Sequence, residues 1–156
     1  MKTATVRELK TELTHRCDKE LIDICIQLSK FKKENKELLT YILFESSSEA
    51  GYVESIKSEV DQQFALINTS SYHYIKKSVR KILRLVKKYI RYSKNKETEV
   101  ELLLYFCQKL SGFQPFIKRS TVLQTILDRE TKSIYKKLNG LHEDLQYDFK
   151  IELESL

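Results

Sequence analysis

The chain is poor in the residues that interrupt regular structure. It has three glycines, one proline and no tryptophan among 156 residues. Folds built from strands and tight turns use glycine and proline freely, so their scarcity favours helices joined by short links. The isolated glycines also exclude the motifs G-x-G-x-x-G and G-x-x-x-x-G-K, whose glycine-rich loops hold nucleotide phosphates.

Long apolar runs are absent as well. The longest, Leu102 to Cys107, is far short of the roughly 20 residues that cross a bilayer. The N-terminal residues carry charges every few positions, which argues against a secretory signal. Cys17, Cys25 and Cys107 are odd in number and widely spaced, and the last two lie in apolar surroundings, which predicts buried free thiols of a reducing compartment. We therefore expect a cytoplasmic protein with no membrane span.

Acidic residues are missing from one long segment. Residues 72–96 contain ten basic residues and no acidic one, although the net charge of the whole chain is only +6. The remainder of the chain therefore has an excess of acid. Much of it lies in residues 141–156, where five carboxylates face a single lysine, Lys150. Such a chain can satisfy its own charges or bind an anionic partner.

The apolar spacing predicts an all-α protein of seven or eight helices. Thr5 and Glu8 have the spacing of a capping box. Further helix starts are expected at Asp18, at a serine within residues 45–51, at Asn95 and at Ser120; Gly112 and Pro115 should break the chain. Residues 52–67 show the clearest amphipathic pattern, and residues 100–110 are apolar almost all round. At this length we expect one domain, residues 1–156, folded as a compact bundle; a short solenoid of stacked helix pairs is the alternative.

The basic segment itself predicts a helix with two distinct faces. An apolar stripe at 3–4 spacing, beginning at Ile75 and Val79, should face the core. The opposite face carries a row of cations of the kind that binds a phosphate backbone: Lys77, Arg80, Lys81, Arg84, Lys87, Lys88 and Arg91. Nearby tyrosines could stack on bases, although Tyr89 lies on the apolar stripe and should pack in the core.

Other roles for this face remain open. The cations could simply be solvated, or paired with the acidic C-terminal helix or with Glu97, Glu99 and Glu101. They could also meet an anionic membrane surface or an acidic protein surface.

No motif for catalysis or metal binding stands out. His15, His73 and His142 lie on three distant segments, and no C-x-x-C or H-E-x-x-H motif occurs. The sequence therefore predicts no metal, no cofactor and no catalytic residue. An enzyme whose site has no sequence motif is a remaining alternative.

Two resemblances accompany this interpretation. The segment Thr5 to Leu13, followed by Glu20-Leu21-Ile22, resembles the opening of the SAP-type helix–extension–helix, a small DNA-binding motif. The glycine-containing extension and the lysine after it are missing here, so that motif's DNA binding is not carried over. The longer pattern over residues 33–45 and 67–107 is similar to a family of small helical bacterial proteins of unknown function, which implies a helical fold and no activity.

The sequence thus favours a non-enzymatic binding module that engages nucleic acid, a ribonucleoprotein or another polyanion through the basic helix. The competing hypothesis is a helical protein–protein adaptor or scaffold whose recognition is apolar. The oligomeric state is not indicated.

Overall fold

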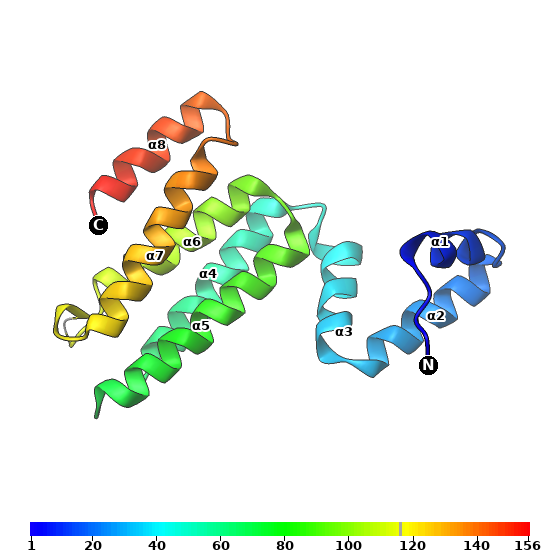
Figure 1. Ribbon diagram of the computed structural model, residues 1–156, viewed down its shortest axis with the longest axis horizontal. Coiled ribbons are helices and arrows are strands. Elements are labelled where there is room, and N and C mark those ends of the chain that lie inside the picture. The colour runs from blue at the N-terminus through cyan, green and yellow to red at the C-terminus, as the bar shows by residue number, and fades with distance from the viewer. Residues whose placement is uncertain (116) are drawn as a thin grey trace. The chain divides into compact units, whose positions relative to one another are not determined.

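Helices account for nearly all of the regular structure in the computed structural model, which describes residues 1–115 and 117–156 (Figure 1). Within these residues there are eight α-helices and no strand, which confirms the predicted all-α class. Their bounds are α1 Val6–Thr14, α2 Asp18–Phe31, α3 Lys33–Thr40, α4 Glu49–Ala65, α5 Tyr72–Ser93, α6 Lys96–Ser111, α7 Thr121–Leu138 and α8 Glu143–Glu154. A π-helical turn, Tyr41–Glu45, follows α3, and a 3₁₀ turn, Ile117–Arg119, precedes α7.

Most of the predicted helix starts are found, because capping is a local interaction. The Thr5 hydroxyl accepts from the Glu8 amide at 3.3 Å, and the Glu8 carboxylate accepts from the Thr5 amide at 2.7 Å. Asn95 caps α6 by accepting from the amides of residues 97 and 98. The expected cap at Asp18 is wrong: Cys17 is the N-cap of α2, and its amide is held by the Glu20 carboxylate at 3.0 Å.

The chain divides into two compact units, Met1–Phe44 and Glu45–Leu156. The single domain expected over residues 1–156 stays a prediction. The first unit pairs α2 with α3, and among residues 1–44, all of them described, only Tyr41 is buried. The predicted burial of Cys25 is therefore wrong. Its stretch is apolar, but the helices of this unit are too few to enclose it.

The second unit is a helical bundle arranged around α6 (Figure 1). Helices α4, α5 and α6 contact one another, α7 packs on α6, and α8 packs on α7. The centre of α6 is enclosed, as its apolar sequence predicts: residues 102–104, Phe106, Cys107 and Leu110 are each at most 2% exposed. The predicted stripe of α4 is also buried, with Val60 completely inaccessible. This core holds α5 and α7 as rigid supports for their outer side chains.

Candidate functional site

Helix α5 is anchored to the bundle by its apolar stripe. Ile75, Val79 and Val86 have no exposed surface, and Ile82 is 2% exposed. These residues recur at intervals of three and four, so burying them turns the opposite face of the helix outwards. At 1.5 Å per residue, the 22 residues of α5 form a support about 33 Å long.

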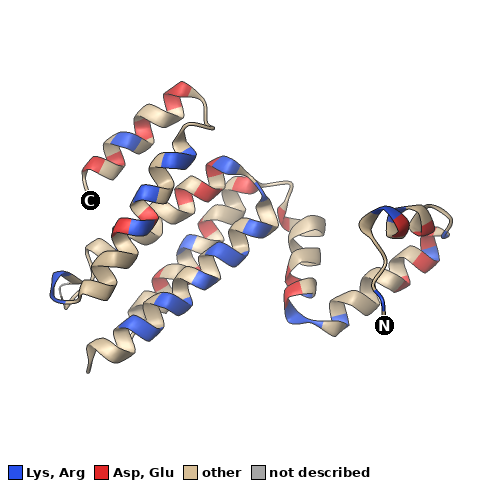
Figure 2. Cartoon of the chain, viewed as in Figure 1, with Lys and Arg blue, Asp and Glu red and all other residues tan. Residues whose placement is uncertain are grey.

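The seven predicted binding residues belong to α5, along which Figure 2 shows repeated Lys and Arg positions, and they alternate with the buried stripe. Lys88 is half-buried, with its ammonium 4.7 Å from the centre of the Tyr89 ring, and the other six are exposed. The acidic helix α8 does not cover them. It lies against α6 and α7, where the Glu152 carboxylate accepts from the Gln108 amide at 2.9 Å and the Leu156 carbonyl accepts from the Ser111 hydroxyl at 3.1 Å.

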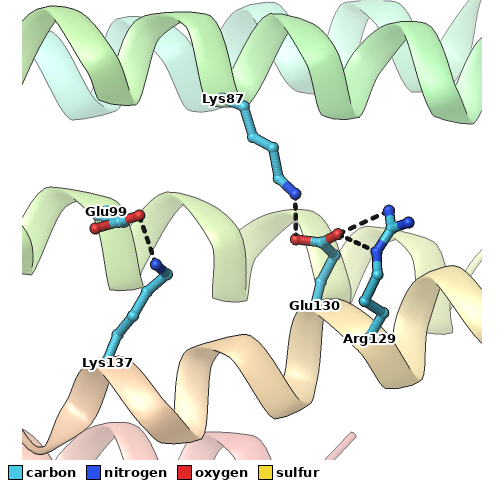
Figure 3. Close-up of polar contacts among 5 residues, drawn as sticks. All are labelled: Lys87, Glu99, Arg129, Glu130 and Lys137. Carbon is cyan, nitrogen blue, oxygen red and sulfur yellow. Dashed lines mark hydrogen bonds and ion pairs between the residues drawn. The ribbon is translucent and has the colours of Figure 1, made fainter.

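Two of the other three acidic candidates for pairing with α5 are engaged elsewhere, and the third, Glu97, is exposed and forms no ion pair with α5 in the described residues. Lys137 of α7 forms an ion pair with Glu99, with 2.9 Å between Nζ and Oε1 (Figure 3). Lys57 of α4 forms one with Glu101, with 2.6 Å between the same atoms. As a result, five of the seven predicted cations form no ion pair with any residue that the structure describes: Lys77, Arg80, Lys81, Arg84 and Arg91.

Lys87 is the cation of α5 that is drawn inwards. Its Nζ lies 2.7 Å from Oε2 of Glu130, a residue of α7 whose side chain is only 1% exposed (Figure 3). The other carboxylate oxygen accepts from Nε of Arg129 at 2.9 Å and forms an ion pair with its Nη2, also at 2.9 Å. Charge-assisted bonds to both oxygens keep this buried carboxylate satisfied, and they tie α5 to α7.

Beside this ion pair, α5 and α7 border a groove of about 640 Å³. Arg80, Arg84 and Lys87 line it from α5, and Arg129 lines it from α7. Its remaining lining includes three aliphatic residues, Leu83, Val122 and Ile126. The groove therefore combines positive walls with an apolar floor, a combination that suits a ligand carrying both anionic and apolar groups.

Sequence reasoning did not find Arg129 or Glu130, although one signal was present. Glu130 occupies a position on the inward stripe of α7, four residues after Ile126 and four before Ile134. A carboxylate at such a position has to find cations inside the fold. Which cations it finds depends on helix packing, and helical periodicity contains no information about that.

The tyrosines of α5 are less available for stacking than their number suggests. Tyr89 packs against α4: its hydroxyl donates to Glu59 at 2.8 Å, and its carbonyl accepts from the Tyr52 hydroxyl at 3.0 Å. Tyr72 and Tyr92 are half-buried, and Tyr74 is 49% exposed. The expected packing of Tyr89 is therefore largely correct, and Tyr74 is the most accessible ring of the helix.

The positions of the metal-ligating residue types and of the buried cysteine are as follows in the described part of the chain. No group of three or more His, Cys, Asp or Glu residues there could hold a metal ion. Burial raises the pKa of the Cys107 thiol to about 12, so this cysteine stays protonated at neutral pH. His142 accepts from the Asp144 amide at 3.4 Å as the N-cap of α8.

A second surface of interest lies in the unit Met1–Phe44. Its large apolar side chains are open, with Phe31 78% and Phe44 71% exposed. Leu28, Leu38 and Ile42 border a groove of about 310 Å³ on this unit. Large apolar side chains left exposed in this way are found at protein-binding surfaces.

No protein-family model matches the chain, and no curated protein or solved structure matches it either. No helix in the described residues is both long and apolar enough to cross a membrane.

Proposed function

We propose that this protein is a non-enzymatic binding module that engages nucleic acid through the outer face of α5. The observation that carries the proposal is the row of cations without ion pairs on that face, five of them on one rigid helix. A lysine or arginine that has no carboxylate partner can take a phosphate, and each one that does so releases condensed counterions.

The spacing of these cations supports a linear polyanion as the partner. With Lys87 and Lys88 included, the seven cations of this face form rows with intervals of three and four residues from Lys77 to Arg91, which is about 4.5–6 Å along the axis. A row of cations of this length can contact several phosphates of one polyanion, whereas a small anion would be bound by a compact cluster of cations. The proposed location is the cytoplasm, since the three cysteines are free thiols and a reducing compartment preserves them.

The test is fluorescence anisotropy with labelled RNA and duplex DNA between 50 and 200 mM salt, on the order of the range over which phosphate contacts are lost. The variant is the triple substitution Lys77→Glu, Lys81→Glu and Arg91→Glu, which changes three exposed side chains without ion pairs. We expect binding at low salt that weakens steeply as salt rises, and a loss of at least about tenfold in the variant.

A matched control keeps the total charge change the same. Lys10, Lys19 and Lys150 are also exposed, form no ion pair within the described part of the chain, and lie outside α5. Replacing each of them by glutamate should leave binding within about twofold of the unsubstituted protein, since contacts with phosphate act at short range. No binding at low salt, or equal losses in both triple variants, would refute the proposal.

The second candidate function is a protein–protein adaptor, favoured by the open apolar side chains of the unit Met1–Phe44. An adaptor of this kind would bind its partner with little dependence on salt, because apolar contacts are not screened. Phe31→Asp would weaken that binding, and the triple substitution in α5 would leave it intact.

A further inference from the structure

The groove between α5 and α7 differs from the rest of the basic surface in having an apolar floor. Arg80 and Arg84 rise from α5 without ion pairs, and Arg129 stands opposite on α7 with 62% of its side chain exposed. Leu83, Val122 and Ile126 line the same groove, and Leu83 and Ile126 are each 5% exposed. Bound phosphates would use the cations of the groove, but they would make no favourable contact with its aliphatic residues.

The form of the nucleic acid decides whether both features can be used. A duplex presents phosphates on its outside and keeps its base faces stacked within, so an aliphatic floor could meet only base edges inside a groove of the duplex. A single strand exposes apolar base faces as well as phosphates, and proteins that bind it combine a positive groove with side chains, mostly aromatic, that cover those faces. In this groove the side chains available to cover them are aliphatic. The volume of about 640 Å³ lies in the usual range of ligand sites, roughly 300–1,000 Å³.

We infer that this groove holds a single-stranded segment of nucleic acid, with phosphates on Arg80, Arg84 and Arg129 and bases against Leu83, Val122 and Ile126. The inference rests on the proposed function and narrows it to one form of nucleic acid and one surface. The outer face of α5 then extends the positive path on which the rest of the strand lies.

Thr125 gives a test that leaves every cation in place. It lines the groove from α7, its side chain is exposed, and its hydroxyl donates only to the Thr121 carbonyl at 2.7 Å. Thr125→Glu brings a negative charge into the groove, and Thr125→Lys brings a positive one at the same position. Both residues form helices at least as well as threonine, so neither variant should unfold α7.

The probes are a labelled 12-nucleotide oligothymidylate, an abasic strand of the same length, and a duplex of the same length, at low salt. We expect the single strand to bind more tightly than the duplex. Thr125→Glu should weaken single-strand binding about fivefold, and Thr125→Lys should strengthen it about threefold. Neither variant should change the affinity for the duplex appreciably. The abasic strand should bind at least about threefold more weakly, because it has no bases to cover the floor.

Each contrary result has a distinct meaning. Tighter binding of the duplex, or single-strand binding that does not respond to either Thr125 variant, overturns the groove and leaves the proposed function standing. Equal binding of the abasic strand overturns the contact between bases and floor. Failure of every probe to bind at low salt overturns both the inference and the proposed function.

Discussion

Glu130 lets the contribution of the α5–α7 ion pair be measured. Its side chain is 1% exposed, and its oxygens lie 2.7 Å from Lys87 and 2.9 Å from Arg129. Breaking a buried pair commonly costs 3–5 kcal/mol, largely because the remaining charge stays buried. Here the remaining charges can reach water, since Lys87 is 47% and Arg129 62% exposed. We therefore expect Glu130→Ala to reduce the free energy of unfolding by only about 2–3 kcal/mol, for the lost bonds and the space left behind.

Replacement by leucine separates these two causes. The position belongs to the apolar stripe of α7 between Ile126 and Ile134, so a leucine there adds apolar contacts while both cations turn to solvent. Buried ion pairs replaced by apolar residues of similar volume often lose little stability or gain some. Glu130→Leu should therefore remain within about 1 kcal/mol of the unsubstituted protein.

The assay is urea unfolding followed by circular dichroism, with Glu154→Ala, an exposed carboxylate of α8, as the control. The control should shift the free energy of unfolding by less than about 0.5 kcal/mol. If Glu130→Leu is as destabilising as Glu130→Ala, the hydrogen-bonded carboxylate itself holds the two helices together, and the reasoning above fails.

Three further predictions concern other sites. With an excess of a thiol reagent at pH 8, Cys17 and Cys25 should react quickly and Cys107 only after denaturation; fast reaction of all three would contradict the burial that raises the pKa of Cys107. Burial by itself would raise the pKa of Asp61, but hydrogen bonds from Lys109 and Tyr105 outweigh it and keep this pKa below the usual value. Its contribution to stability is therefore present above pH ~4 and lost as pH falls through the lowered pKa, so the loss of stability on acid titration should be smaller in Asp61→Asn. Lys94 ends α5 with φ 56°, so Lys94→Gly should raise the free energy of unfolding by about 0.5–1 kcal/mol in urea titrations, and a decrease would contradict this.

The parts of the fold that sequence predicted are those set by neighbours along the chain. The capping box of Thr5 and Glu8 needs residues three apart, and Asn95 caps α6 through amides two and three residues ahead. The stripe of α5 is likewise a matter of spacing. The choice between Asp18 and Cys17 as the N-cap of α2 was missed, because aspartate is the more common capping residue and the two positions differ by a single residue.

The candidate site was predicted only where one helix contains it. Periodicity placed the seven cations on one face, but it could not show that α8 lies on α6 and α7 and leaves that face open. Nor could it bring Arg129 to the opposite side of a groove from Arg84, since the two are far apart in the chain. Burial of Cys25 failed for the same reason: enclosure depends on how many helices surround a residue, and its own stretch does not determine that number.

Glu130 also gives a prediction about binding that is independent of its effect on stability. Its carboxylate holds Lys87 and Arg129, two of the four cations that line the groove, and lowers the positive potential there. Glu130→Leu removes this charge and releases both cations, so a single strand in the groove should bind about fivefold more tightly at low salt, and less so as salt rises. Weaker binding would mean that Glu130 holds the two cations in the orientation that phosphate requires. Unchanged affinity would place the strand outside this groove.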